Sequence, residues 1–149
     1  MAENGRILLA DDDANLQRSV KRIAAAYGYE VISAEIGSEV VAMAAKLLPE
    51  LIVLDIRFPD ADGRDLLQQL KQGPVTAGIP VIVWSGGQHD SVRRLALDLG
   101  AEDFVEKGDP ATLLRKIARV LLRLNQEREA RDSMWPAGNA HFPPWLPAA

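Results

Sequence analysis

The 149 residues of this chain are enough for one domain with a sizeable hydrophobic core. Hydrophobic residues make up 48% and charged residues 26%, and the net charge of −4 argues against non-specific binding to nucleic acids, which requires a basic face. Cysteine is absent and histidine occurs only twice, so disulfides, thiolate metal sites and a conventional zinc site are excluded.

The N-terminus and the apolar runs bear on cellular location. Residues 1–6 lead into only four apolar residues before three aspartates, so we expect no signal peptide. No apolar run approaches the ~18 residues that a membrane-spanning helix needs. We therefore expect a cytoplasmic protein without a membrane partner.

Short apolar runs alternate with amphipathic segments whose apolar residues are spaced by three and four. In chain order, the predicted elements are strand 7–10, helix 13–27, strand 31–34, helix 39–48, strand 51–54, helix 63–72, strand 81–84, helix 91–99, strand 104–105 and helix 110–124. Residues 73–78 predict a loop. The expected helix caps are Asp13, Ser38, Asp90 and Asp109, and the expected terminators are Gly28, Pro49 and Gly100.

Five strand–helix repeats favour an α/β fold with a parallel sheet covered by helices on both faces. The strands are almost wholly apolar, as expected for parallel strands buried on both sides. In such sheets the functional crevice lies beyond the carboxyl ends of the strands. The residues that follow four of the predicted strands should therefore meet, and they are Asp11, Asp55, Ser85 and Lys107.

Three carboxylates are expected at this edge, from Asp11, Asp12 and Asp55. Like charges so close together raise the pKa of at least one carboxyl group, and a divalent cation relieves the conflict. Oxygen ligands without histidine or thiolate favour Mg²⁺. Asp55 stands alone after the central strand, which suits a carboxylate nucleophile that forms an aspartyl phosphate.

Two further groups would complete a phosphoryl-transfer site. The Lys107 ammonium can neutralise phosphoryl oxygens and the Ser85 hydroxyl can donate to one, while Gly86 and Gly87 leave the backbone open to approach. Each residue taken singly has an ordinary interpretation as a turn, a helix cap or a solvated surface group. Their joint placement after four strands makes a shared site the better explanation.

Four motifs resemble the receiver domains of two-component response regulators, over about residues 5–125. The motifs are LADDD at 9–13, IVLDIRFPDADG at 52–63, VIVWSG at 81–86 and GAEDFVEK at 100–107. The resemblance implies a flavodoxin-like (βα)5 fold, a doubly wound parallel sheet with strand order 2-1-3-4-5. It also implies that a histidine kinase or a histidine phosphotransfer protein supplies a phosphoryl group.

The resemblance also implies roles for individual residues. Asp55 would be the phosphoacceptor, and Mg²⁺ would be held by Asp12, Asp55 and the backbone carbonyl of Arg57, with Asp11 acting partly through water.

Three further roles follow from the same resemblance. Lys107 would be the phosphate-binding lysine, and Ser85 and Phe104 would be the switch pair. We expect Ser85 to move toward the phosphoryl group and Phe104 to turn inward behind it.

The sequence departs from the family pattern in three places. Gly108 follows Lys107 where a proline after a cis bond is usual, so we expect a trans bond or a differently directed loop. Arg57 replaces the more usual Met or Asn, and we expect it to shield the phosphoryl group or to pair with an acidic neighbour. The glycines at 86–87 predict an unusually mobile loop.

Residues 126–149 form a helical extension followed by a tail rich in proline and tryptophan. Residues 133–149 contain no Asp, Glu, Lys or Arg. We expect no DNA-binding or catalytic output domain here, and hence a stand-alone receiver. Either the tail or the face formed by the fourth helix, fifth strand and fifth helix is a candidate for homodimerisation.

The expected function is a phosphorylation-dependent switch that changes binding of a downstream protein at that face. It is not an enzyme in the ordinary sense, although it would catalyse its own phosphorylation and dephosphorylation. Two alternatives remain: a pseudo-receiver that binds partners without phosphorylation, and a haloacid-dehalogenase-type phosphatase that uses Asp11 and Asp13.

Overall fold

The computed structural model describes residues 4–86 and 90–134, in which five parallel strands form one sheet of order β2-β1-β3-β4-β5. The strands are β1 (Gly5–Ala10), β2 (Tyr29–Ala34), β3 (Leu51–Leu54), β4 (Val81–Ser85) and β5 (Asp103–Glu106). The helices are α1 (Ala14–Ala26), α2 (Val40–Leu47), α3 (Gly63–Gln72), α4 (Asp90–Asp98) and α5 (Pro110–Met134). The predicted fold class and strand order are confirmed.

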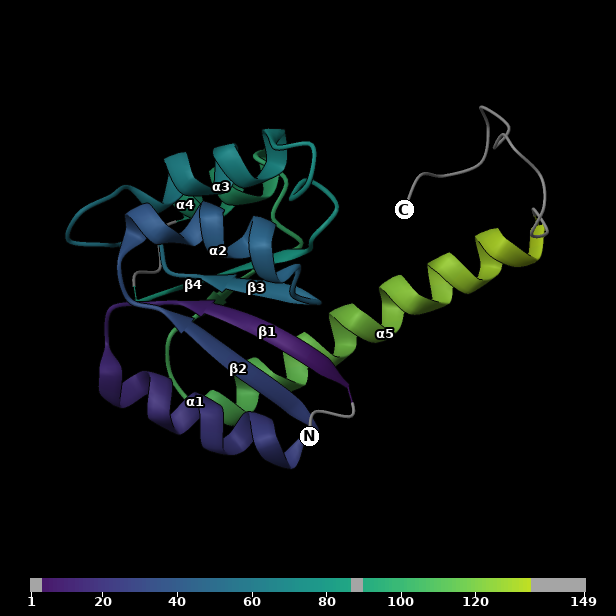
Figure 1. Ribbon diagram of the computed structural model, residues 1–149, viewed down its shortest axis with the longest axis horizontal. Coiled ribbons are helices and arrows are strands. Elements are labelled where there is room, and N and C mark those ends of the chain that lie inside the picture. The colour runs from purple at the N-terminus through teal and green to yellow at the C-terminus, as the bar shows by residue number, and fades with distance from the viewer. Residues whose placement is uncertain (1–3, 87–89, 135–149) are drawn as a thin grey trace.

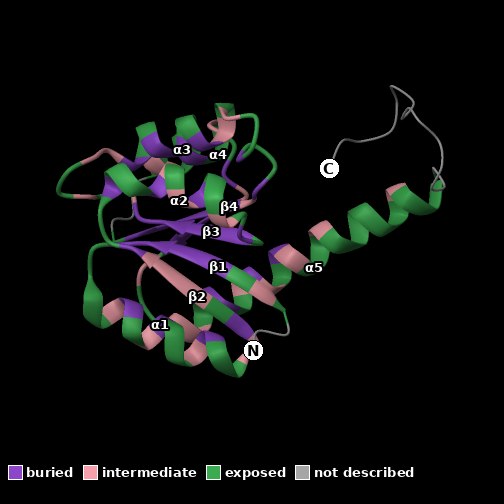
Figure 2. Cartoon of the chain, viewed as in Figure 1, coloured by how far each residue is buried: buried purple, intermediate pink, exposed green. Residues whose placement is uncertain are grey.

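Helices cover both faces of the sheet, with α1 and α5 on one side and α2, α3 and α4 on the other (Figure 1). Successive side chains of a strand point to opposite faces. Ile7 and Leu9 of β1 therefore pack in the hydrophobic cluster beneath α1 and α5, while Leu8 and Ala10 pack in the cluster beneath α2, α3 and α4. Burial on both faces explains why β3 and most of β1 and β4 are apolar. Figure 2 shows these strands mostly in the colour of buried residues.

Several helix caps lie where the sequence placed them. The Asp13 carboxylate accepts hydrogen bonds from the backbone N–H groups of Asn15 and Leu16, at 3.0 and 3.1 Å. Gly28 follows α1 with a φ of 79°, a left-handed conformation that glycine adopts without strain. The Asp109 carboxylate accepts from the Ala111 N–H at 3.1 Å.

The predicted Ser38 cap is wrong. A 3-10 turn, η1 (Gly37–Glu39), precedes α2, and no side chain caps either element. Instead the Asp60 carboxylate accepts hydrogen bonds from the N–H groups of Gly37 and Ser38, at 2.8 and 3.0 Å. A carboxylate distant in sequence thus takes the role that a local hydroxyl was expected to fill.

Helix α5 continues well beyond the sheet. It runs unbroken to Met134, and Figure 1 shows its second half projecting past the edge where the strands begin. The tail at residues 135–149, for which docking or dimerisation was expected, lies outside the described residues. Among the helices that the structure describes, none has the length and apolar character to span a membrane.

Candidate functional site

Four neighbouring strands, β1, β3, β4 and β5, bring the site residues to one edge of the sheet. The backbone hydrogen bonds between neighbouring strands continue beyond the last residue of each strand. The Asp11 N–H donates to Ala34 O at 3.0 Å, and the Asp55 N–H donates to Ala10 O at 2.9 Å. The Lys107 N–H donates to Ser85 O at 2.8 Å. Backbone pairing, rather than side-chain attraction, therefore sets these residues side by side.

The carboxylates of Asp11, Asp12 and Asp55 form a cluster in which one oxygen from each lies within 4.8 Å of the others. Asp11 is fully buried and Asp55 is 4% exposed, whereas Asp12 is exposed. Lys107 Nζ lies 2.7 Å from Asp11 Oδ2 and 2.9 Å from Asp55 Oδ2. One ammonium thus bridges the two buried carboxylates.

The donor set suits a hard divalent cation. All the clustered ligand atoms are carboxylate oxygens, which is the chemistry that Mg²⁺ prefers. Asp11 Oδ2 is buried and accepts no hydrogen bond from the part of the chain that the structure describes, so its ion pair with Lys107 is its one compensating contact. A cation beside this oxygen would offset its burial, and the residues present therefore fit the metal expected from the sequence.

Burial and charge shift the pKa values of this cluster in predictable directions. Burial raises the pKa of Asp11 above its ordinary value, although the Lys107 ammonium and the Asp13 N–H oppose the shift. Burial alone would lower the pKa of Lys107, but its contacts with Asp11 and Asp55 outweigh this and leave its pKa raised. The ammonium is therefore held charged at neutral pH.

Asp11→Asn is expected to stabilise the metal-free protein at neutral pH by about 1 kcal/mol, because it removes a buried negative charge. A raised native pKa means that ionisation of Asp11 opposes folding above that pKa. The advantage of the variant should therefore shrink as pH falls toward the ordinary Asp pKa of about 3.9, because Asp11 is then protonated in the native state and increasingly protonated in the unfolded chain. Urea unfolding from pH 7 to pH 4 measures this, and a variant less stable than wild type at pH 7 would contradict it.

Two groups that sequence reasoning missed hold Asp11 in place. The buried Gln17 side chain donates to the backbone oxygen of Asp11, and the Asp13 N–H donates to Asp11 Oδ1 at 2.9 Å. The available signal for Gln17 was a polar residue beside Leu16 on the apolar face of the first helix. A buried glutamine on such a face needs a polar partner, and a strand end supplies one.

Trp84 is a third neighbour that the sequence did not single out. Its ring centroid lies 5.8 Å from Lys107 Nζ, and its Nε1–H donates to Glu106 O at 3.3 Å. The indole is almost fully buried, so it forms an apolar wall beside the ammonium. This contact orients Lys107 toward the carboxylates.

The remaining predicted residues lie around this cluster. Ser85 is buried and joined to Lys107 through the backbone, and Phe104 already lies inward, 8% exposed. The Arg57 N–H donates to Asp55 Oδ1 at 3.0 Å, while its exposed guanidinium makes no ion pair with any described residue. The expected pairing of Arg57 with an acidic neighbour is therefore not seen.

Two loops that depart from the family pattern follow Lys107 and Ser85. No peptide bond of the described residues is cis, so the expected trans bond between Lys107 and Gly108 is present. The expected mobility after Ser85 concerns Gly86, which is described, and residues 87–89, which lie outside the described part.

Gly63 is where the loop after Asp55 passes closest to a helix. A Cβ at Gly63 would lie 2.4 Å from Ile56 Cα and 2.6 Å from the backbone oxygen of Asp55. These are backbone atoms, so Gly63→Ala should displace the loop, destabilise the fold by about 2 kcal/mol and slow any reaction at Asp55. Chemical denaturation measures the first effect. Gly78→Ala is the control, because a Cβ there meets nothing within 4 Å, and equal stability of the two variants would contradict the prediction.

Comparisons with known proteins agree with this geometry. A family model described as "Response regulator receiver domain" matches residues 7–118, and the chain belongs to this family. Response regulator MprA of Mycobacterium bovis is 33% identical over 129 residues, which cover 87% of this chain and 55% of that protein. Response regulator PleD of Caulobacter vibrioides is 34% identical over 135 residues, covering 87% of this chain and 30% of PleD.

A solved structure extends the comparison to three dimensions. The CheY-like response regulator receiver domain protein of Methanospirillum hungatei is 31% identical and superimposes with a TM-score of 0.75, covering 82% of this chain and 97% of its own. This chain therefore shares the receiver fold throughout that domain. It spans about half the length of MprA and less of PleD, so what those whole proteins do is not transferred to it.

Proposed function

We propose that this receiver domain is a phosphorylation-dependent signalling switch in which Asp55 accepts a phosphoryl group from a histidine kinase or a histidine phosphotransfer protein. The observation that carries the proposal is the Lys107 ammonium held between Asp11 and Asp55 in a buried acidic cluster. Buried carboxylates so close together destabilise the fold unless a cation offsets their charge, and such arrangements are typical of functional sites.

The proposed transfer uses the residues at the strand ends. An Asp55 carboxylate oxygen forms the new O–P bond while the N–P bond of the donor phosphohistidine breaks, and the leaving imidazole nitrogen keeps the bonding electron pair. Lys107 Nζ, already 2.9 Å from Asp55 Oδ2, is placed to offset the charge of the transferred group.

The proposed metal site uses oxygen ligands from the same edge. Mg²⁺ would be held by Asp12, Asp55 and the backbone carbonyl of Arg57, and Asp11 would bind the ion partly through water. The bound ion would neutralise charge on the phosphoryl oxygens. The Arg57 N–H already orients the Asp55 carboxylate through Oδ1.

The proposed output is a change in protein binding at the α4-β5-α5 face, with Ser85 and Phe104 coupling it to the phosphoryl group. Leu95 and Leu97 of α4 are exposed, so α4 offers apolar side chains to a protein partner on two of its sides. Homodimerisation there is the alternative use, although two ion pairs already engage charged groups of this region within the chain. The intrachain pairs are Asp103 with Lys116 and Arg123 with Glu102, at 3.6 and 2.7 Å.

Intact mass after incubation with acetyl phosphate and Mg²⁺ tests the proposal. We expect one phosphate per chain, lost when Mg²⁺ is removed by EDTA. An unmodified mass with Mg²⁺ present would instead favour the pseudo-receiver. Sustained turnover of a generic phosphate ester would favour the phosphatase. The domain itself is proposed to promote only its own phosphorylation and dephosphorylation.

A further inference from the structure

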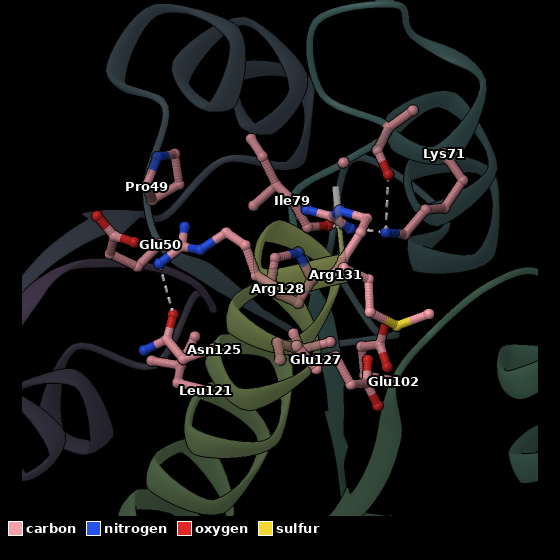
Figure 3. Close-up of a pocket in the computed structure, with 16 residues that line it drawn as sticks. Pro49, Glu50, Lys71, Ile79, Glu102, Leu121, Asn125, Glu127, Arg128 and Arg131 are labelled. Atoms are coloured by element: carbon pink, nitrogen blue, oxygen red, sulfur yellow. Dashed lines mark hydrogen bonds between the residues drawn. The ribbon is translucent and has the colours of Figure 1, made fainter. Parts of the chain in front are cut away.

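A cavity of about 730 Å³ lies between the projecting half of α5 and the edge of the sheet where the strands begin. Its apolar wall consists of Pro49, Ile79, Pro80, Leu121, Leu124 and Met134. Figure 3 shows α5 residues Leu121 and Arg128 facing Pro49 and Ile79 across this space. Its volume lies within the range of sites that enclose a compact ligand.

This cavity is separate from the phosphorylation site. Glu50, Pro80 and Glu102 stand immediately before β3, β4 and β5, at the opposite end of the sheet from Asp55. Whatever occupies the cavity therefore leaves the acidic cluster accessible.

Several polar side chains around the cavity are engaged within the chain. Lys71 Nζ donates to the backbone oxygens of Ala77 and Ile79, at 3.2 and 2.7 Å. Arg128 donates to Asn125 Oδ1 at 2.8 Å, and Glu102 pairs with Arg123 at 2.7 Å. Lys71 and Glu102 therefore already have partners, and the apolar wall suits an occupant that presents apolar side chains.

The chain itself contains a segment of that chemistry. Residues 135–149 contain no Asp, Glu, Lys or Arg, and their large apolar residues are Trp135, Phe142, Trp145 and Leu146. The segment begins directly after Met134, itself a wall residue. We propose that residues 135–149 fold back and place aromatic side chains in this cavity.

The spacing of residues supports this occupant. The wall positions Leu121, Leu124, Arg128 and Arg131 follow one another at intervals of three and four, and Trp135 continues the series. From Leu121 to Met134 the helix rises about 20 Å. Roughly six extended residues cover that distance. Phe142 is therefore within reach of the inner end of the cavity.

The same attachment favours this chain over a second copy. A segment joined to the cavity wall is present there at an effective concentration in the millimolar range, whereas a second copy must associate from dilute solution. This inference does not depend on phosphorylation of Asp55.

Cysteine cross-linking tests the placement, because the natural chain contains no cysteine. Gly78 lines the cavity and has open space for a side chain, so the pair Gly78→Cys with Ala137→Cys should form an intramolecular disulfide on mild oxidation. The control pair is Glu35→Cys with Ala137→Cys, because Glu35 is exposed just after β2, at the other end of the sheet. Equal cross-linking of both pairs, or none, would overturn the proposal, and a cross-linked dimer would assign the cavity to a second copy.

Fluorescence quenching provides a second test that needs no cross-link. Trp84 is buried, so acrylamide quenching reports mainly on Trp135 and Trp145. Gly78→Leu should fill part of the cavity, displace the tail and raise the quenching constant several-fold, whereas Gly78→Ala should not. Unchanged quenching in Gly78→Leu would overturn the proposal. Acetyl phosphate labelling of the same variants should match wild type, which separates this inference from the proposed switch.

Discussion

Asp55→Asn is expected to abolish phosphorylation by acetyl phosphate and Mg²⁺, so that the intact mass stays that of the unmodified chain. The amide has the shape of the carboxylate but no anionic oxygen with which to attack phosphorus. Its Oδ1 can still accept the hydrogen bond from the Arg57 N–H. Loss of the phosphate would therefore reflect lost chemistry rather than a rearranged loop.

Two matched variants make this result specific. Asp65→Asn changes an exposed aspartate on α3 and should leave phosphorylation at the wild-type level. Asp11→Asn should weaken metal-dependent labelling without removing the acceptor. If Asp55→Asn were still phosphorylated while Asp11→Asn was not, the nucleophile would lie directly after β1. That result would favour a phosphatase that uses Asp11 over a signalling switch that uses Asp55.

Lys107→Met is expected to lower the free energy of unfolding by about 2 kcal/mol in the absence of divalent cations. The substitution keeps most of the side-chain volume but leaves the buried carboxylates of Asp11 and Asp55 without their shared ammonium. The Lys107 side chain is 22% exposed, so water screens part of the loss. Urea denaturation in EDTA measures the effect.

The same variant should respond more strongly to Mg²⁺ than wild type does. A divalent cation in the carboxylate cluster would replace the lost positive charge, so a saturating concentration should restore most of the missing stability. Its rate of phosphorylation should nevertheless remain lower by about 100-fold, because Lys107 no longer offsets charge on the phosphoryl group.

The control is Lys116→Met, which removes a more exposed pair with Asp103 at 3.6 Å. Such pairs contribute little, so its stability should change by less than about 0.5 kcal/mol. Equal destabilisation by Lys107→Met and Lys116→Met, or a Lys107→Met defect that Mg²⁺ leaves untouched, would contradict a cation site between the buried carboxylates.

Part of this site could be predicted directly from the amino-acid sequence. Apolar runs that stop at Asp11, Asp55 and Lys107 mark the ends of parallel strands, and such ends share one edge of the sheet. The structure brings these three side chains into contact with Asp12 beside them. Local composition was sufficient here because the backbone ladder, which any apolar strand can form, does the positioning.

Other features depend on neighbours that are distant in sequence. The Asp60 carboxylate accepts from the amides of η1, just before α2, because the loops that follow β2 and β3 meet at the edge of the sheet. Gln17 has a role only because the end of β1 lies against its helix, where the Gln17 side chain donates to the backbone oxygen of Asp11. The inward position of Phe104 follows from packing against the helices on its side of the sheet.

The order of apolar and polar residues along this chain was enough to predict a five-stranded parallel sheet and the membership of its acidic cluster. Both follow from periodicity and from the rule that parallel strands end together. Three-dimensional packing alone established that Lys107 bridges Asp11 and Asp55, that Asp60 ties two loops together, and that a cavity opens beneath α5. These features are distances between segments far apart in the chain, and no local pattern of residues encodes such a distance.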